Sequence, residues 1–323
     1  MKRVLTAVIL IPLVVLALFR APLWLFTLLV LGVALLAARE YFDIAEKTGF
    51  RPFRALAYAA LALSFGISYL VAFVVAQLSS IARQQNESIG VDLHAVGMGS
   101  DLWALSVVIV LVFAGLIFLS AGLRCEALSN ALPDAAVSYL LIPYVAFTLG
   151  LIPILRSGEN GALFLLYLML LVWCGDIAAY YVGRAIGSHT LAPRISPGKT
   201  WEGAAASVIG AVIVGLLLFR FINPVTELFR SAHLLRARIY SFSQPSPQTQ
   251  PFELAPVWFV IAFAVSVNVA AQLGDLVESA LKRGAGVKDS GTLLPGHGGV
   301  LDRIDALLFA LPVGLIFYIA GMS

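Results

Sequence analysis

Long apolar runs dominate this chain and restrict it to one class of fold. Of its 323 residues 60% are hydrophobic, and the mean hydropathy is +0.95, which is typical of integral membrane proteins rather than of soluble domains. Because the hydrocarbon core offers no partner to an unpaired backbone group, we predict an all-α, polytopic membrane protein with about nine transmembrane helices. Nine runs come near the roughly 20 residues that a helix needs to cross a bilayer: Val4 to Phe19, Ala21 to Ala38, Ala55 to Leu78, Leu102 to Leu123, Ala135 to Leu155, Gly161 to Tyr181, Gly203 to Phe219, Leu254 to Leu281 and Ala306 to Ala320.

The distribution of polar residues divides the chain into two parts. The first five runs carry almost no polar residues of chemical interest. We therefore expect residues 1–132 to form an N-terminal transmembrane scaffold and residues 133–323 to form a C-terminal catalytic transmembrane domain. Residues 79–101 are expected to be a polar exposed loop, and residues 223–240 predict an amphipathic helix in the membrane interface.

Lysine and arginine are distributed unequally between the two sides of the membrane. With the N-terminus in the cytoplasm, 14 of them lie on the cytoplasmic side and 7 on the other, and such a bias sets the orientation of membrane proteins. The loops at 182–202 and 282–303 then share the cytoplasmic side. We therefore expect an integral protein of the cell (inner) membrane whose active site faces the cytoplasm.

One stretch near the C-terminal end, Ser279 to Asp305, concentrates charge between two apolar runs. Glycines let backbone N–H groups approach phosphate oxygens, and cations supply the complementary charge. Carboxylates beside phosphates indicate a bridging divalent cation, so the stretch predicts metal-assisted phosphoryl or nucleotidyl chemistry; a solvated charged loop is the alternative. Only 12% of the chain is charged, yet these 27 residues hold six glycines, His297 and seven charged residues: Lys282, Arg283, Lys288, Asp289, Asp302, Arg303 and Asp305.

The sixth run contains an acidic residue that is unusual in an apolar segment. Asp176, Tyr180 and Arg184 follow one another at intervals of four and therefore share one helical face. Acidic residues in membrane helices usually face the bundle interior or a wet cavity. A functional role for Asp176 is favoured over its alternative, an internal ion pair between helices.

The eighth run becomes polar in its last two turns, which predicts that it emerges into a water-accessible cavity. Asp275, Glu278 or Ser279, and Lys282 share one face, and Glu278 can pair with Lys282 four residues later. Asp302 could reach Asp275 once the glycine loop folds back. Two carboxylates from separate elements are what Mg²⁺ requires beside phosphates and waters.

The Gly-Lys-Thr sequence at residues 198–200 resembles a P-loop only superficially. A Walker A motif needs a glycine five residues before Gly198, and that position is Pro193. The preceding element is also a membrane span rather than a buried strand.

These elements together resemble the signature of the phosphatidate cytidylyltransferases, the CDP-diacylglycerol synthases. The resemblance covers roughly Pro133 to Ser323. One element of the family signature is Ser-Pro-x-Lys-Thr-x-Glu-Gly. Its third position is often Lys in the family but is Gly198 here, which leaves Lys199 as the residue expected to bind phosphate. The resemblance rests on the following residues: Ser279, Lys282-Arg283, Lys288-Asp289, Pro295, His297-Gly298-Gly299, Asp302-Arg303 and Asp305, together with Asp176 to Arg184, Ser196 to Gly203 and Gln272 to Ser279.

The resemblance implies an enzyme of phospholipid biosynthesis that transfers CMP from CTP to phosphatidate, giving CDP-diacylglycerol and pyrophosphate. It implies Mg²⁺ bound by Asp275 and Asp302, with a second cation left open. Catalytic roles are implied for Lys199, Asp275, Lys282, Arg283 and Asp302. Substrate contacts are implied for Asp176, Ser196, Lys199, Thr200, Lys288, Asp289, His297, Gly298, Gly299 and Arg303. Asp305 belongs to the same group of candidates.

The expected partners are CTP, phosphatidate and membrane lipid, with no nucleic acid, and a homodimer is left open. Two other functions compete with this one. An enzyme acting on another lipid phosphate or alcohol, such as an isoprenoid cytidylyltransferase or a lipid kinase, would share the phosphate chemistry, and substrate competition would distinguish it. A transporter would use intramembrane charges for passage, but the sequence has no convincing internal repeat of the kind many transporters show.

Overall fold

The computed structural model describes residues 2–84, 90–125, 127–158, 160–232, 256–293 and 298–320. Within them the chain is almost entirely helical and contains one short β-hairpin. The elements in chain order are α1 (Lys2–Arg20), α2 (Leu23–Lys47), α3 (Arg54–Gln84), α4 (Gly90–Gly122), α5 (Leu128–Leu141), the π-helix η1 (Ile142–Phe147), α6 (Thr148–Ser157), α7 (Gly161–Ile186), β1 (Thr190–Ala192), β2 (Ser196–Thr200), α8 (Trp201–Arg220), α9 (Ile222–Ser231), α10 (Val257–Gly284) and α11 (Leu301–Ala320).

The prediction of a polytopic all-α membrane protein is confirmed. Among the described residues, eight helical segments are long and apolar enough to cross a membrane. The remaining expected run coincides with α1, within which Ile11–Arg20 is found as a shorter apolar helix. The prediction of a loop at residues 79–101 is wrong for the described part of this stretch, since α3 continues to Gln84 and α4 begins at Gly90. In a helix the backbone N–H and C=O groups are paired with each other, whereas a loop would leave them without partners.

The fourth of these eight spans is a continuous segment of 30 residues, Leu128–Ser157, built from α5, η1 and α6. Pro143 is the second residue of η1. Proline has no N–H group and cannot continue the regular helical hydrogen-bond ladder, so a local π-turn at this place has a chemical cause. The segment nevertheless runs on as one span, with Tyr144 and Phe147 buried.

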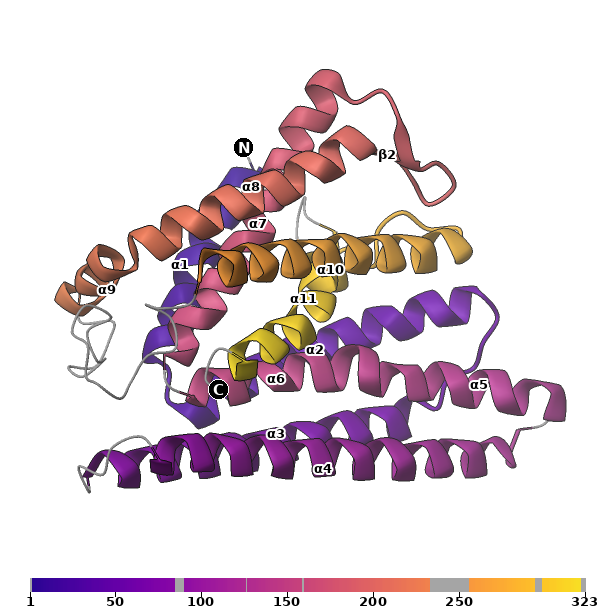
Figure 1. Cartoon of the computed structure of the whole chain (residues 1–323). Coiled ribbons are helices and arrows are strands. Elements are labelled where there is room, and N and C mark those ends of the chain that lie inside the picture. Colours follow the sequence, from indigo (N-terminus) through magenta and orange to yellow (C-terminus); the bar gives the residue numbers. More distant parts are fainter. Residues whose placement is uncertain are drawn as a thin grey trace.

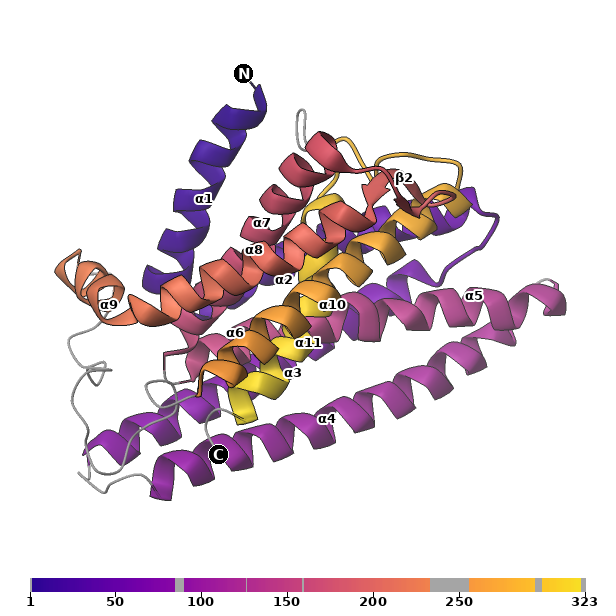
Figure 2. The same ribbon diagram turned by 45° about the horizontal axis from the view of Figure 1, so that its top comes forward.

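The helices form a bundle in which segments distant in sequence lie together (Figure 1). α7 packs against α8, α8 against α10, and α10 against α11, while α2 and α11 both contact α6. α3 and α4 run side by side along the lower edge of Figure 1, and the rotated view in Figure 2 keeps them paired. The amphipathic helix expected at 223–240 is helical as α9 up to Ser231; residues 233–255 lie outside the described part.

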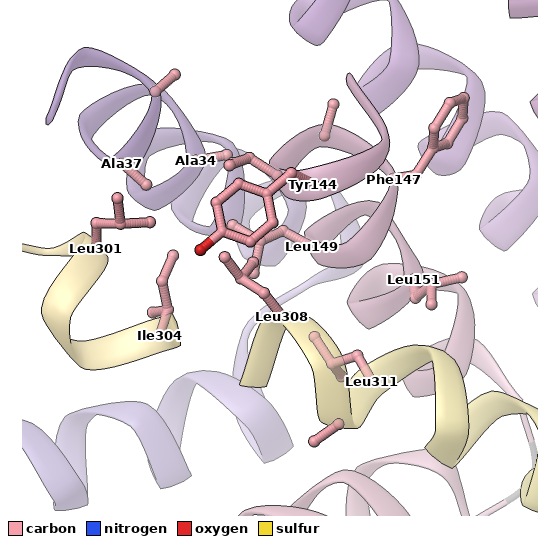
Figure 3. Close-up of a cluster of buried hydrophobic side chains, with 14 of the residues drawn as sticks. Ala34, Ala37, Tyr144, Phe147, Leu149, Leu151, Leu301, Ile304, Leu308 and Leu311 are labelled. Atoms are coloured by element: carbon pink, nitrogen blue, oxygen red, sulfur yellow. The ribbon is translucent and has the colours of Figure 1, made fainter. Parts of the chain in front are cut away.

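The contact between α2 and α11 matters most for the site. Figure 3 shows Leu301, Ile304 and Leu308 of α11 gathered near Ala34 and Ala37 of α2, with the Tyr144 ring of η1 beside them. Ala34 and Ala37 are fully buried, and such small side chains let membrane helices approach closely. The first turns of α11 are therefore held directly against the middle of α2.

Candidate active site

A β-hairpin between α7 and α8 carries Lys199. β1 and β2 pair antiparallel, with Thr190 opposite Thr200 and Ala192 opposite Ser196. The Thr200 side-chain oxygen accepts a hydrogen bond of 3.1 Å from the Gly203 N–H and so caps the N-terminus of α8, which is a preferred role of threonine. Lys199 thus directly precedes the residue that caps α8.

A second set of contacts ties the base of this hairpin to α8. The Glu202 carboxylate accepts a hydrogen bond of 2.8 Å from the Ser188 hydroxyl, and the His189 Nδ1 atom lies 2.6 Å from the same Glu202 oxygen. The backbone N–H of His189 also donates to Glu202 at 3.3 Å. The end of α7 and the first turn of α8 are therefore joined through one carboxylate.

The hairpin closes one wall of a cavity of about 500 Å³. The other walls are formed by α7, α8 and α10, which contribute Asp176, Ser207 and Asp275, among others. The face shared by Asp176, Tyr180 and Arg184 borders this cavity, as expected from their spacing. Polar groups from elements far apart in sequence therefore surround one space.

Lys199 and Asp275 form an ion pair across the cavity wall. The Lys199 Nζ atom lies 2.5 Å from one Asp275 oxygen, and the other Asp275 oxygen accepts a hydrogen bond of 3.3 Å from Ser279. Asp176 is close enough to interact electrostatically with Asp275, Lys199 and Arg303. The cavity thus contains one lysine facing two carboxylates.

A ladder of amide and hydroxyl groups lies beside these charges, between α8 and α10. Asn268 donates to the Ser207 hydroxyl at 3.0 Å, and Gln272 donates to the Asn268 side-chain oxygen at 2.8 Å. Gln272 also reaches the Ala204 carbonyl at 3.3 Å. These bonds fix the face of α10 that presents Asp275 one turn further on.

A second charged cluster surrounds Lys282. Its ammonium group donates to Asp302 at 2.5 Å and also pairs with Glu278, which is fully buried. Asp302 further accepts hydrogen bonds from the backbone N–H groups of Gly299, at 2.7 Å, and Ser290, at 3.1 Å. Asp302 therefore organises the glycine loop at the start of α11 as well as pairing with a cation.

Comparison with known proteins identifies the family of this chain. A model of the cytidylyltransferase family matches residues 1–320. The chain belongs to this family. The phosphatidate cytidylyltransferase of Haemophilus influenzae is 38% identical to it over 180 residues, which is 55% of this chain and 54% of that protein. The corresponding protein of Staphylococcus saprophyticus is 36% identical over 180 residues, or 56% and 57% of the two chains. The match thus spans little more than half the length of these relatives.

In this cytidylyltransferase-family chain, the predicted site residues fall into three groups. The first lines the cavity and includes Asp176, Lys199, Thr200 and Asp275. The second lies around Lys282 and comprises Asp302, Gly299 and Asp305, the last within electrostatic reach of Asp275 and Lys282. The third consists of side chains on the outer surface, namely Arg283, Lys288, Asp289 and Arg303.

Several of these residues have contacts that the sequence did not predict. The Arg283 Nε atom donates to the Ile195 carbonyl at 3.2 Å and so joins the end of α10 to the hairpin. Ser196 is half-buried in β2. Gly298 lies directly over the Asp302 carboxylate. His297 lies outside the described residues.

The structure adds one residue that the sequence did not single out, Glu40 of α2. Glu40 is 7% exposed. Its carboxylate accepts hydrogen bonds from the Ser290 hydroxyl in the glycine loop and from the backbone N–H groups of Val300 and Leu301 at the start of α11. The available signal was an acidic residue directly after Ala37-Ala38-Arg39, near the end of an apolar run. Without the fold nothing linked it to the charged stretch.

The oxygen donors suit a divalent cation, although the described residues hold no cluster of three or more potential metal ligands. Mg²⁺ is usually bound by one or two carboxylates together with substrate phosphates and water. Asp275 meets this need best because it is 39% exposed and lines the cavity. Asp302, 7% exposed, already accepts bonds from Lys282 and two backbone N–H groups.

Proposed function

We propose that this protein is a phosphatidate cytidylyltransferase, which transfers CMP from CTP to phosphatidate and releases pyrophosphate. The proposal is supported by family membership and by the name that the matched relatives carry. The observation that carries it is the cavity in which Lys199 of the hairpin meets Asp275 of α10 and Asp176 of α7. A cation and carboxylates at a cavity lined by membrane-spanning helices suit the joining of a nucleotide to a lipid phosphate.

The reaction needs no side-chain nucleophile. A phosphate oxygen of phosphatidate attacks the α-phosphorus of CTP, and the bond from that phosphorus to the oxygen bridging it to the β-phosphate breaks in line, so that pyrophosphate leaves with the electron pair. Both reacting groups carry negative charge. The protein must therefore hold them together and neutralise them.

The residues of the chain divide this work between them. Lys199 is placed to exchange its contact with Asp275 for a phosphate oxygen. Asp275 and Asp302 would hold Mg²⁺, which supplies Lewis-acid neutralisation of the triphosphate. Lys282 holds Asp302 in place, because its ammonium group contacts both Asp302 and Glu278. Arg283, Lys288 and Arg303 add positive charge on the outer surface of the protein.

The surface position of the cations also bears on orientation. We propose that the hairpin and the start of α11 face the cytoplasm, where CTP is available, and that the protein lies in the cell (inner) membrane. The twofold excess of Lys and Arg on that side supports this orientation. Phosphatidate would then enter from the bilayer and CTP from the aqueous side.

Purified protein in lipid vesicles, supplied with phosphatidate and each of the four ribonucleoside triphosphates in turn, tests the proposal. We expect Mg²⁺-dependent pyrophosphate release with CTP, and a lipid product whose mass equals that of CDP-diacylglycerol. Competition with an isoprenoid phosphate and with diacylglycerol identifies a different lipid acceptor. Absence of pyrophosphate release with CTP and phosphatidate would contradict the proposal.

A further inference from the structure

Glu40 is a buried carboxylate whose hydrogen bonds all reach a segment far along the chain. One of its oxygens accepts from the Val300 N–H at 2.9 Å, and the other accepts from the Leu301 N–H and the Ser290 hydroxyl, both at 2.8 Å. The first N–H groups of a helix have no partner within the helix, and a negative charge at that end interacts favourably with the helix dipole. Glu40 of α2 therefore acts as the N-terminal cap of α11.

The glycine loop is shaped to receive this carboxylate. A Cβ atom added at Gly291 would lie 2.5 Å from a Glu40 oxygen, and one added at Gly299 would collide with the other oxygen. Both glycines are therefore needed for close approach of backbone to a charged group. Two of the glycines in the charged stretch serve an internal carboxylate rather than a phosphate.

A continuous chain of bonds leads from Glu40 to the candidate metal ligand. Ser290 donates its hydroxyl hydrogen to Glu40, and its hydroxyl oxygen accepts the Asp302 N–H at 3.3 Å. The Ser290 N–H in turn donates to the Asp302 carboxylate at 3.1 Å. Val300, which donates to Glu40, directly follows Gly299, which donates to Asp302. The position of Asp302 is thus defined relative to α2.

We propose that Glu40 is a positioning residue for the transfer reaction, holding the loop and Asp302 in the geometry that binds cation and phosphates. This inference rests on the proposed function. If Glu40 has this role, the N-terminal helix α2 contributes to the active site by holding the glycine loop that positions Asp302. Residues that orient metal ligands typically contribute roughly 10- to 100-fold in metal affinity or activity.

The variant Glu40→Gln preserves size but replaces one acceptor oxygen with an NH₂ group, which opposes the N–H and hydroxyl donors around it. We expect kcat to fall roughly 10- to 100-fold and the Mg²⁺ concentration for half-maximal rate to rise. Asp134→Asn is the matched control: Asp134 is also a buried acid, 3% exposed, and accepts the Arg51 N–H at 2.8 Å away from the site. It should change stability without changing kcat or the Mg²⁺ response.

Hydrogen–deuterium exchange supplies a readout that does not depend on turnover. The amides of Val300 and Leu301 should exchange faster in Glu40→Gln than in the wild type, and not in Asp134→Asn. If the Gln variant yields too little folded protein, Ser290→Ala removes only the hydroxyl between Glu40 and Asp302 and should shift the same quantities by less. Unchanged exchange, or faster exchange with wild-type kcat and Mg²⁺ response, overturns the proposal. If the wild type shows no activity with CTP, the proposed function fails, and exchange alone decides whether Glu40 organises the loop.

Discussion

The ammonium group of Lys199 lies 2.5 Å from a carboxylate oxygen of Asp275, which joins the hairpin to α10 across the cavity wall. Both side chains are partly exposed, 27% and 39% respectively. An ion pair with this exposure contributes little to stability, in the range of about 0 to 1 kcal/mol. The pair is therefore better explained by what each partner does to a substrate than by what the pair does for folding.

Replacing Lys199 should reduce activity without unfolding the protein. Lys199→Ala is expected to cost about 2 to 4 kcal/mol of transition-state stabilisation, as does the loss of one preorganised charge or donor elsewhere. Lys199→Gln should be nearly as inactive, because a long side chain without a positive charge does not neutralise the phosphate. Steady-state kcat/KM for CTP measures the effect, and Arg194→Ala, which removes an exposed cation from the same hairpin, is the control. Reduced yield with normal specific activity would mean that Lys199 has only a structural role.

The two candidate metal ligands should differ in what they do for stability. Asp275→Asn and Asp302→Asn each remove a charge that we propose binds the cation, so each should abolish turnover at limiting Mg²⁺. Asp302→Asn should also lower the free energy of unfolding by about 1 to 3 kcal/mol, because it breaks buried charge-assisted bonds to Lys282 and the loop. Asp275→Asn, partly exposed, should change it by about 0.5 kcal/mol or less.

Mg²⁺ titration and thermal unfolding in detergent separate these two effects. Wild-type rates at limiting Mg²⁺ in either variant would remove that residue from the set of ligands. An equal decrease of the free energy of unfolding in both variants would contradict the expectation that the buried Asp302 contributes more to stability than the partly exposed Asp275.

Thr200 offers a test of whether a predicted substrate contact is instead a helix cap. Its hydroxyl accepts the Gly203 N–H, so Thr200→Ala should destabilise the start of α8 by about 1 kcal/mol. Thr200→Ser keeps the acceptor and should restore both stability and activity. Thr200→Asn, also a good cap, distinguishes the roles: activity close to wild type indicates capping alone, whereas a stable but inactive variant indicates that the hydroxyl also contacts substrate.

The sequence predicted the spans and the main candidate residues for identifiable physical reasons. Hydropathy determines where helices cross a bilayer, so most spans agree with the structure. The spacing of four residues predicted that Asp176, Tyr180 and Arg184 share one helical face, and in the structure all three line the same cavity. The pairing of Glu278 with Lys282 also followed from helical periodicity and is confirmed.

Contacts between distant elements were beyond the reach of these arguments. Nothing local in the sequence indicates that Glu40 meets Val300 and Leu301, since that depends on how α2 packs against α11. The ion pair between Lys199 and Asp275 likewise depends on the approach of the hairpin to α10. Periodicity describes one helix at a time, whereas tertiary packing decides which faces meet.

The last prediction concerns membrane topology, because the proposed site requires two loops on the same side. α8 separates the hairpin from α9, and α10 separates the following segment from the glycine loop. Each crossing reverses the side, so the hairpin and the glycine loop should both be cytoplasmic and the segment after α9 should lie outside. Single cysteines at Ser188, Ala232 and Thr292 report on the three positions, since all three residues are exposed.

Thr292 is preferred to Ser290 as the cysteine position in the glycine loop, because Ser290 is buried and hydrogen-bonded to Glu40. In a background where Cys125 and Cys174 are replaced by Ser, a membrane-impermeant thiol reagent applied to intact cells should label only the cysteine at 232. The cysteines at 188 and 292 should react after the membrane is permeabilised, which shows that they are accessible in principle. Labelling of 188 or 292 in intact cells would separate the candidate residues from cytoplasmic CTP. The transfer reaction could not then occur at this cavity, whatever the charges around it.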